Sequence, residues 1–142
     1  METGGYKGRS RVLSKQELRS GITRGLGIPG THIVSEYGMS ELSSQAYDRT
    51  VPGSDETQIQ NLKSKIGNSQ FPPWARAQII SPETGKEVAE GETGLIRILD
   101  LANLCSVAAI QTEDLAIRRG TGFELMGRAA QAEPRGCSLM MR

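Results

Sequence analysis

The sequence of 142 residues has little of the side-chain chemistry that builds metal centres or disulfide scaffolds. It contains one histidine, His32, and two cysteines, Cys105 and Cys137, which lie 32 positions apart and form no CxxC pair. A structural zinc site needs four such ligands at short spacings, and a disulfide-rich domain needs a much higher density of cysteine. Neither class of protein is expected here.

The chain also lacks a long apolar run and an excess of charge of either sign. Its longest apolar stretches, such as Ser106–Ile110, are far shorter than the ~20 residues that cross a bilayer. Lys and Arg total 17 against 16 Asp and Glu, which gives no broad electrostatic footprint for nucleic acid. The first residues carry no apolar segment typical of a secretory signal. We therefore expect no membrane span, no nucleic-acid partner and a cytoplasmic location.

Core-forming residues are scarce as well. The sequence has only six aromatic residues but 17 glycines, so it is rich in turns and can build only a modest core. This composition is typical of one part of a larger assembly.

One helix is predicted near the amino terminus. Ser14 and Glu17 have the spacing of a capping box, and Leu18, Ile22 and Leu26 then recur at helical intervals. The pattern predicts a helix over about 15–25 that ends near one of the glycines at 25 and 27.

The remaining segments favour strands and one long loop. We expect a short extended segment at 31–35, an exposed loop over 50–70, and strands near 75–79, 94–100, 106–111 and 122–126. The predicted fold class is α+β, with a helix and strands in the first half and an antiparallel β region in the second.

The segment Tyr37-Gly-Met-Ser-Glu41 follows a predicted strand and carries ligand-binding chemistry. An aromatic ring can stack on a base, Gly38 allows close approach of the backbone, Ser40 can bond to phosphate, and Glu41 can hold Mg²⁺. The alternative interpretation is a strand-to-helix turn in which Ser40 or Ser43 caps a helix.

Two further segments carry polar groups after predicted strands. The carboxylate of Asp114, in Thr112-Glu-Asp114, could accept hydrogen bonds from both hydroxyls of a ribose, although an acidic surface turn is the simpler interpretation. Arg128, in Gly127-Arg128, could reach phosphate or ribose oxygens with its rigid fork of donors, or could be an ordinary surface charge.

The order of these motifs resembles the latter half of the adenylate-forming superfamily, in which YGxTE, GxxG, TGD and GR motifs converge on one nucleotide. The chain has YGMSE at 37–41, GETG at 91–94, TED at 112–114 and FELMGR at 123–128. More narrowly, ETGGYKGRSR at 2–11, YGMSELSSQ at 37–45 and GRAAQAEPRGCSL at 127–139 resemble the acyl-protein synthetases, the long-chain fatty acid–protein ligases of bacterial bioluminescence.

This resemblance implies a partial adenylate-forming fold that uses ATP and Mg²⁺ to convert a long-chain fatty acid into an acyl-adenylate. By position, Tyr37 would stack on adenine, Ser40 would touch the α-phosphate and Glu41 would contact Mg²⁺. Asp114 would hold the ribose hydroxyls, and Arg128 would contact the ribose or the adjacent phosphate. Gly4 and Gly5 would form a backbone wall beside the adenine.

The resemblance also implies a covalent acyl acceptor, because members of this family carry the acyl group as a thioester on a cysteine close to the chain end. Cys137 occupies such a position, and a thiolate is an able nucleophile toward an acyl-adenylate. The alternative is an inert cysteine in the terminal segment. We expect Cys105, within an apolar run, to be a small buried hydrophobe and His32 to be packed structurally.

The sequence departs from the family pattern where Glu113 replaces the glycine of TGD. The glycine-rich phosphate-binding loop and the amino-terminal half are missing, so we expect residues 1–142 to be a carboxy-terminal segment that is inactive alone. Relatives in bioluminescence work with an acyl reductase and an acyl transferase, which are the implied partners. The alternative function is a non-catalytic acyl-carrying or interaction module that docks on a partner.

Overall fold

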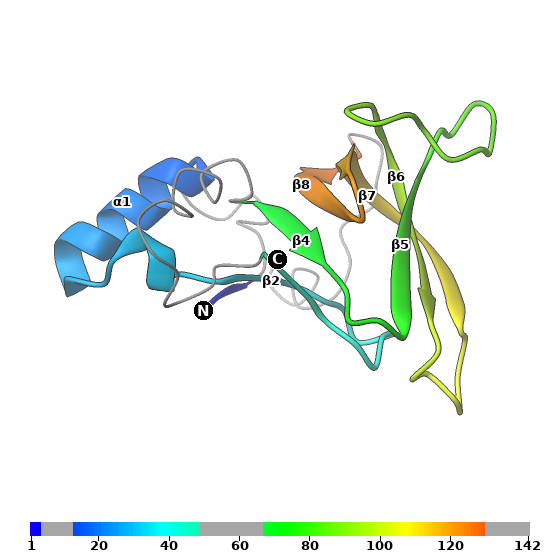
Figure 1. Ribbon diagram of the computed structural model, residues 1–142, viewed down its shortest axis with the longest axis horizontal. Helices are drawn as coiled ribbons and strands as arrows, with labels where there is room; N and C mark the ends of the chain where they lie inside the picture. The colour runs from blue at the N-terminus through cyan, green and yellow to red at the C-terminus, as the bar shows by residue number, and fades with distance from the viewer. Residues whose placement is uncertain (4–12, 49–66, 130–142) are drawn as a thin grey trace, which may run out of the picture.

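The computed structural model describes residues 1–3, 13–48 and 67–129, which form one α-helix, one 3-10 helix and eight strands in a single sheet (Figure 1). In chain order the elements are β1 (Glu2–Thr3), α1 (Lys15–Leu26), η1 (Gly30–His32), β2 (Ser35–Tyr37), β3 (Ala46–Asp48), β4 (Asn68–Gln70), β5 (Ala75–Ile80), β6 (Thr93–Asp100), β7 (Ala109–Arg119) and β8 (Gly122–Arg128). The predicted α+β class is confirmed.

Helix α1 forms where the capping signals predicted it. The Ser14 side chain accepts a hydrogen bond from the Glu17 N–H at 3.2 Å, and the Glu17 carboxylate accepts one from the Ser14 N–H at 2.8 Å. These reciprocal bonds satisfy donors that a helix start otherwise leaves unpaired. Gly27 ends the helix in the left-handed conformation, at φ 67°.

The strands are ordered β1-β2-β3-β4-β8-β7-β6-β5 across the sheet. Among these described strands only β1 and β2 pair in parallel, and every other neighbouring pair is antiparallel. The pairing of β4 with β8 joins the short strands of the first half to the long hairpins of the second. The predicted antiparallel β region is therefore continuous with the strands that follow α1.

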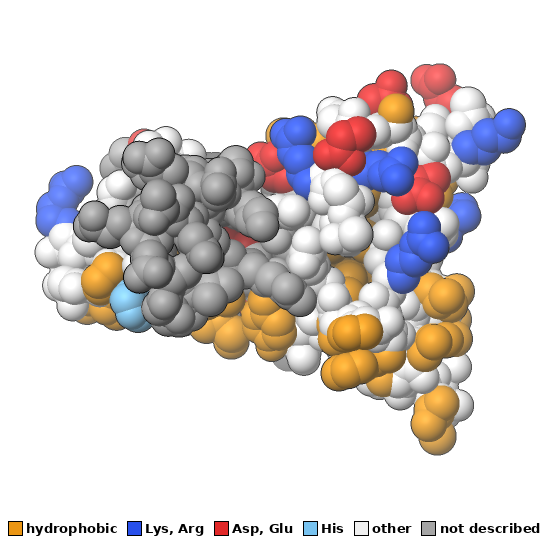
Figure 2. Space-filling view, viewed as in Figure 1, with side chains coloured by type: hydrophobic (Ala, Val, Ile, Leu, Met, Phe, Trp, Pro, Cys, Tyr) orange, Lys and Arg blue, Asp and Glu red, His pale blue; other side chains and the backbone are white. Residues whose placement is uncertain are grey.

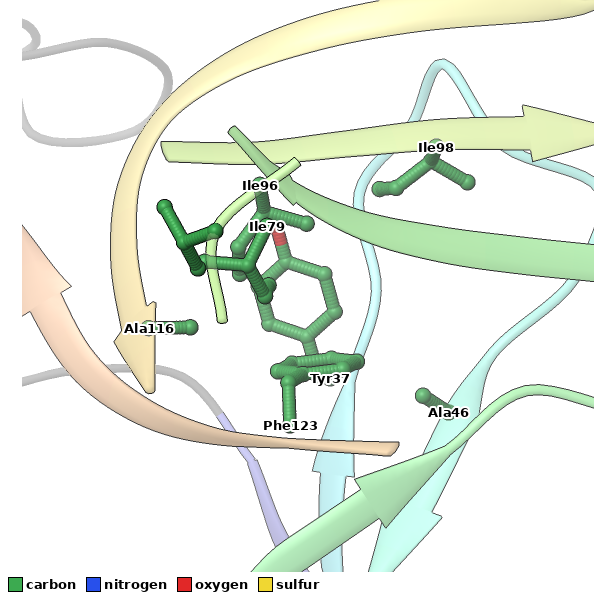
Figure 3. Close-up of a cluster of buried hydrophobic side chains, with 8 residues drawn as sticks. Tyr37, Ala46, Ile79, Ile96, Ile98, Ala116 and Phe123 are labelled. Atoms are coloured by element: carbon green, nitrogen blue, oxygen red, sulfur yellow. The ribbon is translucent and has the colours of Figure 1, made fainter. Parts of the chain in front are cut away.

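The sheet curls around a small hydrophobic cluster. Phe123, Ile96 and Ile98 are fully buried, and Tyr37 is 7% exposed. Figure 3 shows the Tyr37 ring beside Phe123 and the isoleucine side chains of the neighbouring strands. Since these residues come from β2, β6 and β8, burial of their apolar surface holds both halves of the sheet together.

Helix α1 is attached to the first strands by a buried ion pair. Arg19, 8% exposed, donates from Nη2 to Asp48 of β3 and, at 2.9 Å, to the Ser35 hydroxyl of β2. Its Nε also lies 3.8 Å from a carboxylate oxygen of Glu2 in β1. One side chain on the helix therefore contacts three neighbouring strands.

Several predicted segments differ from the observed ones. Residues 30–32 form a turn of 3-10 helix, so the strand before the YGMSE segment begins at Ser35 rather than at Thr31. Residues 68–70, expected in a loop, form β4 because they pair with both β3 and β8. Strand β7 begins at Ala109 and continues to Arg119, so the TED segment lies within a strand and not in a turn.

Figure 2 shows charged side chains gathered over one end of the β-rich half and exposed hydrophobic side chains over the other. Exposed apolar residues at or near the β6–β7 connection include Leu101, Leu104 and Val107. Among the described residues, no helix is both long and apolar enough to cross a membrane.

Candidate functional site

Tyr37 ends β2 and connects the first half of the sheet to the second. Its hydroxyl donates a hydrogen bond to Asp114 Oδ2 at 2.9 Å, although the two residues are 77 positions apart. Its ring meets Phe123 and Phe71 in edge-to-face contacts, with centroids 5.3 and 6.3 Å apart. Burial is the main reason that the pKa of the Tyr37 hydroxyl lies far above its ordinary value. The negative charge of Asp114 and the hydrogen bond to it raise this pKa further.

A β-bulge presents the TED segment at this position. Leu95 pairs with Leu115 and Arg97 pairs with Gln111, so the three residues 112–114 of β7 lie opposite the single residue Ile96 of β6. Thr112 lies in the bulge. Its hydroxyl donates a hydrogen bond to the Ile96 carbonyl at 2.9 Å and accepts one from the Asp114 N–H at 3.2 Å. Such extra residues redirect side chains out of the regular alternation of a strand.

A second irregularity, in β8, brings Arg128 to the same place. Leu115 pairs with Gly127 and Ala116 with Leu125, so β8 has one extra residue there, and Gly127 adopts φ 126°, which favours glycine. Arg128 is the register partner of Asp114.

Three charged groups meet as a result. Arg128 Nε lies 3.7 Å from Asp114 Oδ1, and its Nη2 donates to Glu113 Oε2 at 2.9 Å. The structure therefore brings together Tyr37, Asp114 and Arg128, which the motif order predicted to converge, and adds Glu113. A carboxylate beside a fork of guanidinium donors can bind a group that both donates and accepts hydrogen bonds, as ribose and its phosphate do.

The other predicted residues of the YGMSE segment lie on the loop after β2. Ser40 and Glu41 are both exposed, and the Ser40 hydroxyl donates to Glu41 Oε2 at 3.1 Å. At Gly38 a Cβ atom would displace the end of the Glu36 side chain and lie 3.1 Å from Gln45 Cγ. The described residues 38–45 form a loop that leads directly into β3, so the alternative of a helix N-cap at Ser40 or Ser43 is wrong.

This loop is fixed by two polar residues near the start of the β6–β7 connection. Asp100 accepts the N–H groups of Ser43 and Ser44 at 3.1 and 2.9 Å and the Ser44 hydroxyl at 2.9 Å. Asn103 donates to the Glu41 carbonyl at 2.8 Å. Burial opposes ionisation of Asp100, but its hydrogen bonds prevail and hold its pKa below the ordinary value.

The motifs did not identify Asp100, Asn103 or Glu113 as residues that organise the site. The sequence pattern does indicate that Asp100 is buried, because it continues the alternation in which Ile96 and Ile98 face inward. The bond from Asn103 to the loop joins segments 62 residues apart, and no local pattern encodes it.

Two expectations outside the site are wrong. Cys105 is exposed, because it lies in the β6–β7 connection rather than inside a strand. His32 is exposed as well, at the end of η1, where Nδ1 lies 3.2 Å from the Thr31 hydroxyl. Gly4, Gly5 and Cys137 lie outside the described residues.

The described residues contain no group of three or more His, Cys, Asp or Glu side chains arranged to hold a metal ion. Mg²⁺ is often held by one or two carboxylates together with substrate phosphates. Glu41, an exposed carboxylate beside a hydroxyl, has the donor chemistry for such a shared site.

Comparison with known proteins gives relatives in sequence and in fold, although no family model matches the sequence. A long-chain-fatty-acid–luciferin-component ligase from Aliivibrio fischeri is 34% identical over 89 residues, covering 56% of this chain and 24% of that protein. The protein of the same name from Vibrio harveyi is 30% identical over 77 residues, covering 49% and 20%. The matches thus span a quarter or less of the curated relatives.

Among solved structures, MatB from Rhodopseudomonas palustris superposes in its apo form with a TM-score of 0.56 and 16% identity, covering 92% of this chain and 26% of that one. Its ATP-bound form gives a TM-score of 0.52 and 17% identity, covering 78% and 23%. In sequence the chain resembles the long-chain fatty acid–luciferin component ligases, and its fold is that of part of an adenylate-forming enzyme.

Proposed function

We propose that this chain is the carboxy-terminal segment of a ligase that activates a long-chain fatty acid with ATP and passes the acyl group to a cysteine thiol. The observation that carries this proposal is the meeting of Tyr37, Asp114 and Arg128 at one point of a curled sheet. The names of the sequence relatives supply the substrate class, a fatty acid, and the ATP-bound form of MatB supports ATP as the nucleotide.

In the first step a carboxylate oxygen of the fatty acid would attack the α-phosphorus of ATP. The bond between the α-phosphorus and the bridging oxygen breaks, and pyrophosphate leaves. In the second step a thiolate would attack the acyl carbon, the bond from that carbon to the phosphate oxygen of AMP breaks, and AMP leaves. Both steps depend more on orientation and on neutralised phosphate charge than on a protein base.

Within this scheme the carboxylate of Asp114 accepts the ribose hydroxyls, and Arg128 donates to the ribose or the adjacent phosphate. Tyr37 is 7% exposed and has Phe71 and Phe123 against its ring, so stacking of adenine on Tyr37 would require these side chains to uncover it. The Tyr37 hydroxyl has a second role, because its bond orients Asp114.

The loop after Tyr37 would face the phosphates. Ser40 would contact the α-phosphate, and Glu41 would share Mg²⁺ with it, with the loop held in place through Asp100 and Asn103. Gly4 and Gly5 would form the wall beside the adenine, as the resemblance implies.

The proposed activity needs more than this chain. The curated relatives are about four to five times as long as the matched segment, and correct positioning supplies much of the rate in such reactions. We therefore propose that the chain alone is inactive. From the resemblance we also propose that an acyl reductase and an acyl transferase receive the acyl group and that the reaction takes place in the cytoplasm.

The activation step is tested by exchange of labelled pyrophosphate into ATP with a long-chain fatty acid, using this chain and a longer protein that spans the length of the curated relatives. The longer protein should catalyse exchange, and Asp114→Asn in it should lower the rate at least about tenfold, the effect of removing a ligand-orienting hydrogen bond. Exchange by the short chain would contradict its inactivity. No exchange by either protein would contradict the ligase function.

The acceptor is tested separately with a supplied acyl-adenylate. Thioester labelling should disappear in Cys137→Ser and persist in Cys105→Ser, the matched control. Because Cys105 is exposed, the control is demanding: its thiol is accessible to the same reagent. The reverse pattern would reassign the acceptor to Cys105.

A further inference from the structure

Arg128 is shared between two carboxylates. Its Nη2 donates to Glu113 Oε2 at 2.9 Å, while its Nε lies 3.7 Å from Asp114 Oδ1. The side chains of Arg128 and Glu113 are 40% and 41% exposed, and that of Asp114 is 22% exposed. The donor fork is therefore already engaged on the side of Glu113.

The charges of this cluster do not favour an anionic ligand. With both carboxylates ionised, Glu113, Asp114 and Arg128 carry a net charge of −1, so an approaching phosphate meets repulsion and must compete for the guanidinium. Asp114 is held by the Tyr37 hydroxyl and by the bulge, whereas the side chain of Glu113 is half exposed. Glu113 is the partner that can leave.

The backbone around Glu113 is fixed independently of this ion pair. Its carbonyl accepts the Ala129 N–H at 2.9 Å, directly beside Arg128. Release of the ion pair therefore requires side-chain rotation alone, and the strands stay in register.

We propose that Glu113 competes with bound nucleotide for the guanidinium of Arg128, and so sets the affinity of this site for phosphorylated nucleotides. This inference rests on the proposed nucleotide site. It assigns a specificity role to a residue that is not one of the predicted ligands. Glu113 would lower affinity for ATP, which presents anionic oxygens to Arg128, more than it lowers affinity for uncharged adenosine.

The test is an NMR titration of the whole chain with ATP and, separately, with adenosine, in the wild type and in Glu113→Gln. Exposed ion pairs contribute roughly 0.2–1 kcal/mol, so the variant should bind ATP about 1.4 to 5 times more tightly. Its affinity for adenosine should increase by a smaller factor or not at all, because adenosine presents no anionic oxygen to Arg128. The gain for ATP should also shrink at high salt, because the pair is exposed.

Glu124→Gln is a matched control. Glu124 pairs with Arg119 across the same two strands, also at 2.9 Å, with side chains 42% and 43% exposed. Glu124→Gln removes one negative charge, as Glu113→Gln does, but at a position outside the TED segment. The affinity for ATP should therefore stay at the wild-type value. If Glu124→Gln raised the affinity for ATP as much as Glu113→Gln does, the effect would come from net charge alone, and the inference would be wrong.

Asp114→Asn separates the two proposals. If it weakens binding of both ligands while Glu113→Gln leaves ATP binding unchanged or weaker, the nucleotide site stands and the role of Glu113 is rejected. If Glu113→Gln tightens adenosine as much as ATP, the charge argument is rejected. If neither ligand binds any of the four proteins, the nucleotide site and the inference fall together.

Discussion

The hydroxyl of Tyr37 lies 2.9 Å from Asp114 Oδ2, although their strands are four places apart in the sheet order. At the usual ~4.8 Å between neighbouring strands, a flat sheet would separate β2 and β7 by roughly 19 Å. The hydrogen bond can form because the sheet curls and the tyrosine side chain spans the interior of the curve. Curvature is therefore what joins the YGMSE and TED segments.

Tyr37→Phe should remove this connection and leave the core filled. A hydrogen bond to a charged group contributes about 1.5–3 kcal/mol, so the free energy of unfolding should fall by about 2 kcal/mol. Tyr47→Phe is the control, because Tyr47 is 40% exposed and its replacement should cost less than ~0.5 kcal/mol. Urea denaturation measures both, and equal effects of the two substitutions would contradict a structural role for the bond.

The raised pKa of Tyr37 predicts a loss of stability in alkali. Its pKa in the folded chain lies above the ordinary value near 10, so the contribution of the neutral hydroxyl is complete below pH 10. It is lost progressively as the pH rises above 10, because the unfolded chain ionises first. The free energy of unfolding, measured between pH 8 and 12, should decline more steeply in the wild type than in Tyr37→Phe, and parallel curves would exclude this cause.

The lowered pKa of Asp100 predicts a loss of stability in acid. Its pKa is held below the ordinary value of 3.8 by hydrogen bonds from Ser43, Ser44 and Ala102, which outweigh the effect of burial. The stabilisation is present above that value and is lost as the pH falls below it toward the folded-state pKa. Asp100→Asn should reduce the part of the stability that is lost as the pH falls below about 4.

The same substitution should lower stability at neutral pH. Hydrogen bonds to a charged group contribute about 1.5–3 kcal/mol, and an amide would place its own donors against the N–H groups of Ser43 and Ser44. Glu83→Gln, in an exposed turn, serves as the control and should have little effect. Loss of the Asp100 contacts should also loosen the loop carrying Glu41, seen as faster amide exchange at 43 and 44.

Elements encoded by neighbouring residues were predictable from the sequence. The capping box at Ser14 and the alternation in 75–79 and 94–100 each depend on contacts within a few positions, and α1, β5 and β6 occur there. The β4 strand was missed because its three residues are polar and form a strand only by lying between β3 and β8.

In the site, too, some features were predictable from the sequence and others depend on the pairing of distant strands. The motif order predicted that Tyr37, Asp114 and Arg128 converge, and they do. The bulges that aim Asp114 and Arg128 were not predictable, because a bulge is a mismatch between two strands and neither strand alone records it. The interpretation of TED as a turn failed for this reason: its residues lie in a bulge within a strand.

Arg19 provides the most direct test of how the first half is held together. Its ion pair with Asp48 is buried, and it also bonds to Ser35 of β2. Breaking a buried pair by removing one partner costs about 3–5 kcal/mol, because a charge is left without compensation. Arg19→Ala should therefore destabilise the fold by that amount, whereas Arg24→Ala, on the exposed last turn of α1, should cost less than ~0.5 kcal/mol.

The double variant Arg19→Met with Asp48→Asn separates uncompensated charge from lost packing. If the cost comes from the isolated carboxylate, neutralising both partners should recover much of the stability lost in Arg19→Met, giving a coupling energy of roughly 0.5–3 kcal/mol. Additive effects of the two substitutions in urea denaturation would show that Arg19 acts through packing of its aliphatic stem instead. In either case α1, which contacts β1, β2 and β3 through this one side chain, should show the earliest loss of amide protection as the pair is broken.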